Sequence, residues 1–481
     1  MKKSTGLVSV LVVAGIAYTG VSWYVGQQAE KVIQQTVVST NDNFRKAMVG
    51  SSANEIPVLR IDRFERGIFS SMIDYTLVIP NTSEAPVEIR LADQLSHGPF
   101  PWMLISQGSF SPVLAASTTR LLPTPFTQKW INTQKDGQSP LVINTRVAFN
   151  NDTTAVMHFK PVDSLVDGEN LVFSGGTISI DWKNNFLDNQ VKGGFDSLSF
   201  EDKNEQSAVR LSQIAIQHDA TQAGDQIKVG GSLGVKRAVI QDAELEQDII
   251  FDNTALVYNS IQKGDLLDAD MRYDFGSVKM GTTDFGSLAL GARAANVDAQ
   301  QLMSLLTLID TIDARQNQDN SLDLTPEEEA ALMASIKAVI ATKPSFALDP
   351  VVWKTAQGES SALATLQLVT PTADPVGQDL TPDEFLLHAI QSFDLRLKVS
   401  RPMLVGIFTQ LESNPENRAE LQAFANMMFD GYVSNLESAG LATLQGDTAQ
   451  TELVFSNNEL KVNGKLMHQE ELLGVILQLL F

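Results

Sequence analysis

Residues 58–69 read VLRIDRFERGIF, and residues 71–79 read SMIDYTLVI. In both stretches apolar side chains alternate with polar ones along much of the length. Because successive side chains of a β-strand point to opposite faces of a sheet, this alternation predicts two strands with one face on a core and one in water. The turn-forming residues Pro80-Asn81-Thr82-Ser83 follow the second stretch.

The same alternation recurs as far as residue 294. Turns such as Lys135-Asp136-Gly137 and Ala223-Gly224-Asp225 separate the stretches, as in antiparallel hairpins. Long helices do not alternate with them, which argues against a doubly wound sheet. We therefore expect residues 51–297 to form an antiparallel β-rich domain, either a long curved sheet or a sandwich. The strands predicted after residue 140 cover 141–149, 153–159, 171–180, 191–200, 209–218, 226–235, 239–245, 249–258, 267–275 and 284–294.

Helical patterns enter after residue 297. Thr325-Pro326-Glu327-Glu328 and Thr381-Pro382-Asp383-Glu384 both combine a capping threonine, a proline at the first helical position and a glutamate that closes a capping box. Residues 298–481 are therefore expected to form an α+β domain, a C-terminal mixed helical and hairpin region. Its predicted helices are 298–314, one from 325, one from 381, 402–411, 415–438 and 470–481, and its predicted hairpins are 345–355 with 361–369 and 450–455 with 459–463.

The chain begins with Lys2 and Lys3, followed by an uncharged apolar run over residues 6–25. Twenty helical residues span about 30 Å, the thickness of a bilayer's hydrocarbon core. The lysines favour a cytoplasmic N-terminus by the positive-inside tendency. We expect residues 1–25 to be a transmembrane anchor in a bacterial inner membrane, crossed once, with the body in the periplasm. A cleaved signal peptide ending near Gly15-Ile16-Ala17 is the alternative.

Residues 26–50 read as a polar helix that keeps a few apolar side chains, among them Val32, Ile33, Val37 and Phe44. We interpret this helix as a stalk between the anchor and the body. The alternative is a dimerising helix, which would make the protein a homo-oligomer.

The net charge is −22, from 57 acidic and 35 basic side chains. Such a charge repels phosphate backbones, so we expect no nucleic-acid partner. A basic protein, a metal cation or a neutral apolar ligand remain open. The chain has no cysteine, which excludes disulfides, thiolate metal sites and a cysteine nucleophile.

No familiar catalytic motif, P-loop or dinucleotide fingerprint occurs in the sequence. We predict no catalytic residue, no cofactor and no metal. Residues 317–323, with Glu328 after them, place oxygen ligands as a calcium loop does, but Leu322 occupies the position of the required glycine. We interpret this segment as a solvated loop between helices.

His97 is the one histidine with rigid surroundings, because Pro99 and Pro101 follow it closely. We interpret it as structural, with an imidazole that hydrogen-bonds to nearby backbone. The alternative is a hydrolase site assembled by folding from His97 and distant carboxylates.

The sequence contains 23 phenylalanines against six tyrosines and five tryptophans. A curved sheet with an uncovered apolar face could hold acyl chains. The simpler interpretation is that these rings fill the core, as expected for Phe69, Phe100, Phe149, Phe173 and Phe200.

Three sequence elements resemble the YdgA-like family of bacterial membrane-anchored envelope proteins of unknown function. They are FERGIFSS at 64–71, HGP at 97–99 and LKVNGK at 460–465. The resemblance implies a single-pass inner-membrane protein with a periplasmic body and no assigned reaction. It makes these positions candidates for a ligand or structural motif: Arg66, Gly67, His97, Gly98, Pro99, Asn463 and Gly464.

The anchor and long sheet are also similar, in architecture alone, to AsmA-like envelope proteins, which are associated with lipid traffic. We therefore expect a membrane-anchored periplasmic scaffold or binding module of the bacterial envelope, without catalytic activity. The alternatives are a lipid or acyl-chain binding or transfer protein, and a periplasmic hydrolase with a site around His97.

Overall fold

The computed structural model describes residues 19, 22, 24, 26–42, 44–45, 56–80, 85–134, 137–166, 169–183, 187–204, 206–245, 247–319, 323–371, 381–412, 414–457 and 459–467. The chain divides into two compact units. The N-terminal unit contains Met1–Asn204 and Gln213–Gln222, and the C-terminal unit contains Glu205–Ser212 and Ala223–Phe481.

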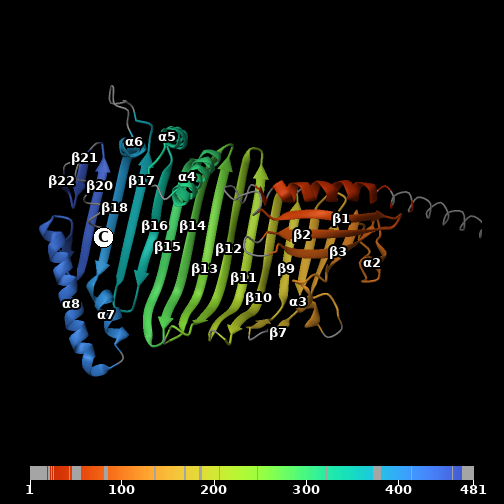
Figure 1. Ribbon diagram of the computed structural model, residues 1–481, viewed down its shortest axis with the longest axis horizontal. Coiled ribbons are helices and arrows are strands. Elements are labelled where there is room, and N and C mark those ends of the chain that lie inside the picture. The colour runs from red at the N-terminus through yellow and green to blue at the C-terminus, as the bar shows by residue number, and fades with distance from the viewer. Residues whose placement is uncertain are drawn as a thin grey trace, which may run out of the picture. The chain divides into compact units, whose positions relative to one another are not determined.

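The N-terminal unit contains a helical segment at residues 26–42 and a sheet whose strands all pair antiparallel (Figure 1). Strands β1 to β6 pair in chain order. Strand β6 then pairs with β9 and β7 with β8, and β9 and β8 pair in one register with successive segments of β10. The strands are β1 (Val58–Arg66), β2 (Ser70–Ile79), β3 (Val87–His97), β4 (Ala115–Leu122), β5 (Leu141–Val147), β6 (Thr153–Phe159), β7 (Val162–Val166), β8 (Glu169–Phe173), β9 (Gly176–Lys183) and β10 (Asp188–Asp202), with the short helices α2 (Trp102–Ile105) and α3 (Gln128–Asn132).

Strand β11 (Ser207–Ala223) has residues in both units. In the C-terminal unit, β12 to β18 pair in chain order and β18 then pairs with β20, again all antiparallel. The strands are β12 (Gln226–Gln241), β13 (Ile249–Lys263), β14 (Leu266–Met280), β15 (Thr283–Asp298), β16 (Ser345–Lys354), β17 (Glu359–Leu368), β18 (Ile390–Ser400), β19 (Thr443–Gln445), β20 (Thr448–Ser456), β21 (Glu459–Val462) and β22 (Lys465–Met467). The helices are α4 (Ala299–Asp319), α5 (Pro326–Ile340), α6 (Pro382–Ala389), α7 (Arg401–Leu411) and α8 (Pro415–Ser438).

The hairpin turns follow from local sequence. Gly224 joins β11 to β12 and Gly264 joins β13 to β14, with φ of 64° and 60°. Tight hairpin turns need φ above zero, which glycine adopts without steric cost. Inside the strands, Asn253 and Asn296 adopt φ of 52° and 55°. The register shifts at Asn296 but is unchanged on either side of Asn253. Asparagine tolerates this region better than most residues.

The expected helix starts are confirmed. The side chains of Thr325 and Thr381 each accept a hydrogen bond from the backbone N–H of the glutamate three residues later. The carboxylate of that glutamate accepts a hydrogen bond from the backbone N–H of the threonine. Helices α5 and α6 then cover one end of the sheet face that carries Phe346 and Leu366, with which they share an apolar cluster.

The α+β class and the antiparallel sheet are confirmed, but two strand boundaries are corrected. The strand expected over 171–180 is two strands, β8 and β9, which are interrupted at Ser174 and Gly175 and both pair with β10. Gly175 has φ of 74° at this interruption. The strands expected over 226–235 and 239–245 are the single strand β12 and a following turn, because neither glycine nor proline interrupts Lys236 to Gln241. Strands β3, β4, β7, β18, β19 and β22 were not expected from the sequence.

No helix in the described part of the chain is long and apolar enough to cross a membrane. The anchor expected over residues 6–25 lies outside the described residues, apart from residues 19, 22 and 24. The same holds for the helix expected over 470–481. The segment expected to be a stalk is helical over residues 26–42, and it packs on the sheet of the N-terminal unit through Ala29 and Ile33.

Candidate functional site

The first two family-like elements meet at His97, the last residue of β3. The Nε2 atom of its ring lies 2.9 Å from the Ser71 hydroxyl oxygen, and Nδ1 lies 2.9 Å from the Ile68 carbonyl oxygen. The His97 backbone N–H donates to the Phe69 carbonyl at 2.8 Å. Because a carbonyl oxygen only accepts, Nδ1 carries a proton and donates to Ile68. In the neutral ring, Nε2 accepts from the Ser71 hydroxyl.

Burial reinforces this protonation state. His97 is 1% exposed, and burial is the main cause that lowers its pKa below the ordinary value. The charge of the nearby Arg66 lowers the pKa further, whereas the hydrogen bond to the Ile68 carbonyl opposes the shift. Desolvation disfavours the charged imidazolium, which explains the direction.

The glycines of the two elements allow close backbone contacts. The Gly67 N–H donates to the Ser70 carbonyl at 2.8 Å in the turn between β1 and β2, and the Gly98 N–H donates to the Leu114 carbonyl at 2.8 Å. A Cβ atom on Gly98 would lie 1.8 Å from the Val113 carbonyl oxygen. Only glycine fits at position 98 without moving the backbone.

One stripe of the N-terminal helix contacts this site. Ser22, Gly26 and Glu30 are four residues apart, so they share a helix face. The Ser22 hydroxyl donates to the Gly98 carbonyl at 2.7 Å, and both partners lie in the N-terminal unit. Gly26 lies against the His97 ring, because a Cβ atom there would be 2.4 Å from Cε1. We call Ser22, Gly26, Ser71, His97 and Gly98 the His97 cluster.

Two further contacts hold the same helix. Arg66 donates to the Glu30 carboxylate at 2.7 Å. Near the other end, the Asn41 side-chain amide donates to the Leu59 carbonyl and accepts from the Leu59 N–H, each at 2.8 Å. The amide thus pairs with β1 as a neighbouring strand would. The family-like positions Arg66, His97 and Gly98 therefore fix a helix onto the sheet.

This geometry does not suit the hydrolase alternative. A hydroxyl does lie within hydrogen-bonding distance of the imidazole, as that alternative requires. However, Ser71 and His97 are each 1% exposed, so neither atom reaches a substrate. The arrangement supports the structural interpretation of His97.

The third family-like element has a structural role in the C-terminal unit. Asn463 and Gly464 form the turn between β21 and β22, with φ of 49° and 78°. The Asn463 side chain accepts from the Glu452 N–H at 2.9 Å and donates to the Gly440 carbonyl at 3.0 Å. One amide thus ties the end of helix α8 to strand β20.

Helical residues 29–40 and the sheet of the N-terminal unit enclose a cavity of about 1070 Å³, which we call the N-terminal cavity. Much of its wall is apolar, with Leu91, Leu95 and Ile143 among its members. Asp93 also lines it and is 5% exposed. The Thr119 hydroxyl donates to the Asp93 carboxyl at 2.9 Å.

Burial is the main cause that raises the pKa of Asp93, and hydrogen bonds from Thr119 and Ser117 partly oppose the rise. The pKa of Tyr75 is raised first by burial and then by the Asp93 charge. The cavity therefore contains a carboxyl group whose charge is poorly solvated.

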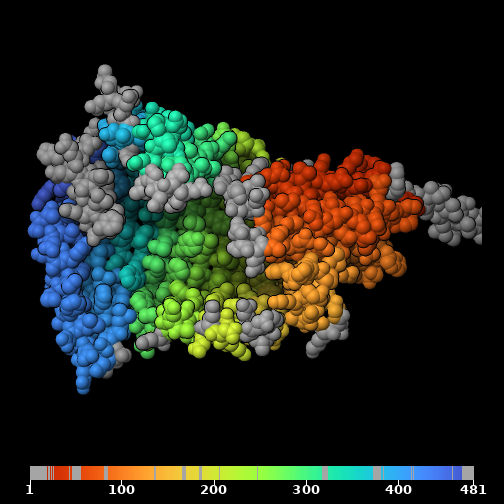
Figure 2. Space-filling model, viewed as in Figure 1, coloured from red at the N-terminus to blue at the C-terminus, as the bar shows by residue number. Residues whose placement is uncertain are grey.

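The C-terminal unit presents an apolar face. Because residues opposite each other in antiparallel strands share a face, the register places one side chain from each of six strands in a row. The row consists of Tyr258, Met271, Ala292, Leu348, Ala364 and Leu395. A hollow of about 600 Å³ lies over its first five members, and Figure 2 shows this face hollowed beside helix α4. We call it the C-terminal apolar face.

Large apolar side chains remain exposed there. Leu348 is 54% exposed and Met271 is 42% exposed. Tyr273 and Leu290, paired in the adjacent row, are each 38% exposed. The opposite face carries ion pairs such as Arg272 with Asp274, 2.7 Å apart. One face of the sheet is thus polar, and the other offers apolar surface to a ligand.

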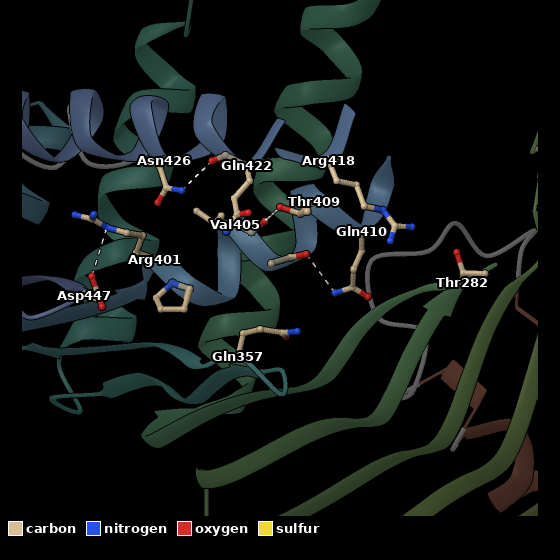
Figure 3. A pocket seen from close by; sticks show the side chains of 12 residues that line it. Thr282, Gln357, Arg401, Val405, Thr409, Gln410, Arg418, Gln422, Asn426 and Asp447 are labelled. Atoms are coloured by element: carbon tan, nitrogen blue, oxygen red, sulfur yellow. Dashed lines mark hydrogen bonds and ion pairs between the residues drawn. The ribbon is translucent and has the colours of Figure 1, made fainter. Parts of the chain in front are cut away.

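A third pocket, of about 720 Å³, lies beside helices α7 and α8 (Figure 3). Arg401 and Arg418 line it, but Arg401 forms ion pairs with Asp430 at 2.6 Å and Asp447 at 3.8 Å. Arg418 donates to the Glu412 carbonyl. Because carboxylates offset the Arg401 charge, the pocket has little excess positive charge with which to hold an anion.

The other sequence candidates have local roles. Glu328 closes the capping box of α5 and forms an ion pair with Arg315 at 2.7 Å.

Among the phenylalanines, Phe173 packs against Phe195 with ring centroids 5.1 Å apart. The core interpretation is wrong for the other four, because a large fraction of each ring reaches solvent: Phe69, Phe100, Phe149 and Phe200 are between 40% and 53% exposed.

Comparison with known families assigns the whole chain. Residues 1–470 match the family described as "Bacterial protein of unknown function (DUF945)", and the chain therefore belongs to this family. It is similar to protein YdgA of Escherichia coli (strain K12), with 23% identity over 99% of this chain and 97% of YdgA. It is also similar to the uncharacterized protein YihF of the same strain, with 21% identity over 98% of each chain. No solved structure matches. The resemblance expected from the sequence is thus confirmed.

Proposed function

We propose that this protein binds an extended apolar ligand of the acyl-chain type on the C-terminal apolar face. The observation that supports the proposal is a row of apolar side chains that crosses six strands in register. Met271 and Leu348 in this row are exposed, and its other four members are half-buried. Exposed contiguous apolar surface is costly in water, at about 25 cal/mol per Å², and it commonly marks a binding site.

The dimensions of the face favour a chain-like ligand. Neighbouring strands lie about 4.8 Å apart, so six strands make a row about 24 Å long. An acyl chain reaches across half of a hydrocarbon core, or about 15 Å. The row is long enough for one such chain to lie across the strands. The net charge of −22 disfavours strongly anionic head groups and favours neutral or zwitterionic ones.

In this proposal residues 6–25 hold the chain in the bacterial inner membrane and the body lies in the periplasm. The uncharged run after Lys2 and Lys3 supports this placement. The protein then acts as a membrane-anchored binding module without chemistry of its own. Self-association through the helical segment stays a prediction.

Photocrosslinking in living cells tests the ligand. A photoreactive amino acid at position 271, on the apolar face, is expected to form adducts with lipid when the full-length chain is irradiated in an expressing bacterium. The same amino acid at position 257 is the control, because Val257 pairs with Arg272 and so lies on the opposite face. Mass spectrometry identifies the adducts. Adducts with protein alone at position 271 would support the scaffold interpretation instead.

A charge on the apolar face should weaken ligand binding. Leu348→Asp is expected to reduce the lipid adduct at position 271 about tenfold, because losing one apolar contact of this size costs about 1.4 kcal/mol or more. Leu348 is 54% exposed, so the substitution leaves the core intact. Val257→Asp on the other face should leave the adduct yield unchanged. Equal losses from both variants would contradict a binding role for this face.

A further inference from the structure

Asp93 occupies a core position in strand β3. Its partners in register are Thr119 on β4 and Ile73 on β2, and Ile73 is fully buried. Leu91 and Leu95, two residues before and after it, point to the same face and line the same cavity. A carboxyl group thus stands between two leucines on the buried face of β3.

The partners of this carboxyl group are hydroxyls. Thr119 donates to it at 2.9 Å, and Ser117 contributes a second side-chain hydrogen bond. Within the described part of the chain, no lysine or arginine forms an ion pair with Asp93. A buried carboxylate normally has a cationic partner or a metal, because its desolvation is costly. Here the protein supplies neither.

The missing partner has room beside the carboxyl group. Asp93, Ser117 and Thr119 all line the N-terminal cavity, whose volume of about 1070 Å³ is enough for a small-molecule ligand. No group of three His, Cys, Asp or Glu side chains that could hold a metal ion occurs among the described residues. An organic cation fits the site, because one carboxylate and two hydroxyls can accept the three hydrogen bonds of an ammonium group.

We propose that the N-terminal cavity binds an amphiphilic amine, with its ammonium group on Asp93, Ser117 and Thr119 and its apolar chain along Leu91, Leu95 and Ile143. This site lies in a different unit from the C-terminal apolar face, and it binds a positively charged group. The proposal is therefore independent of the proposed function. The net charge of −22 favours the approach of cations. A fatty-acid carboxylate of the same length is rejected by like-charge repulsion.

The probe is octylammonium, titrated by calorimetry into the full-length chain in nanodiscs, with empty nanodiscs as the blank. Octylammonium is expected to bind at least about tenfold more tightly than octanoate, and octanol should fall between them. Asp93→Asn keeps the size of the side chain and an oxygen that accepts from Thr119, so the unit should stay folded. It is expected to lower octylammonium affinity about tenfold.

Asp181→Asn is the matched control, because Asp181 pairs with Thr154 on the face away from the cavity. This variant should bind octylammonium as the unsubstituted protein does. Trp182 lines the cavity, so its fluorescence reports occupancy, and the change should disappear in Trp182→Phe. A thermal melt confirms that each variant is folded. Unchanged affinity in folded Asp93→Asn, or equal binding of octanoate, would overturn the proposal.

Discussion

Replacing Gly98 by alanine is expected to destabilise the N-terminal unit by more than about 3 kcal/mol. The new Cβ atom would lie 1.8 Å from the Val113 carbonyl oxygen and 2.7 Å from the Leu114 carbonyl oxygen. Both obstacles are backbone atoms, so no side chain can rotate to make room. The C-terminal end of β3 and the N-terminal end of β4 must therefore move apart. This movement breaks the hydrogen bond from the Gly98 N–H to the Leu114 carbonyl.

Hydrogen exchange followed by mass spectrometry is the suitable measurement, because it reports the local stability of each strand separately. Peptides from β3 and β4 should exchange much faster in Gly98→Ala, while those from β13 to β17 should not change. Gly234→Ala is the control, since a Cβ atom there meets nothing within 4 Å. If β3 and β4 are protected in Gly98→Ala as they are in the control, the backbone at residues 98, 113 and 114 can move apart at little cost, and the prediction is wrong.

The parts of the fold that sequence reasoning predicted are set by local interactions. The capping boxes at Thr325 and Thr381 depend on residues three positions apart, and both occur as expected. Strand β6 depends on alternation within seven residues, and its observed bounds equal the expected ones. Propensity and pattern act at this range, so they can be read without knowing the fold.

The His97 cluster could not be assembled in this way. Ser22 and its acceptor Gly98 are 76 residues apart, and Ser71 and His97 are 26 apart. Ser22, Gly26 and Glu30 share one helix face, but their spacing does not identify the strand residues that they contact. Strand β3 was itself not predicted, so His97 was not placed at a strand end.

The two apolar sites differ in how far the sequence could reveal them. Asp93 stands between Leu91 and Leu95 on one face of β3, and a carboxyl group in that position is an anomaly visible in the sequence. The C-terminal apolar face depends on the register of six strands. A shift of one residue would move Leu348 to the polar face, and alternation alone does not fix the pairing.

Replacing His97 by alanine is the second substitution with a large expected effect, about 2–4 kcal/mol in the N-terminal unit. The change leaves the buried Ser71 hydroxyl without its partner, which costs about 1–3 kcal/mol. The Ile68 carbonyl also loses its partner, at a smaller cost because Ile68 is exposed and water can replace the imidazole. It also opens a space beside Gly26, where the helix now touches the ring. Hydrogen exchange should show earlier opening of residues 26–42. His158→Ala, at an exposed position of the same unit, should have no such effect.

The pH dependence of His97 has a definite sign. Burial lowers its pKa in the folded chain, whereas in the unfolded chain it titrates near the ordinary value of 6.5. Below pH 6.5 the unfolded state therefore binds the proton more readily, so the contribution of His97 to stability is complete above this pH. It declines as the pH falls toward the folded pKa, by at most about 1.4 kcal/mol per pH unit. Protection of residues 26–42 should consequently decrease between pH 7 and pH 5. His97→Asn should abolish this decrease, and a decrease of the same size in that variant would assign the titration to another group.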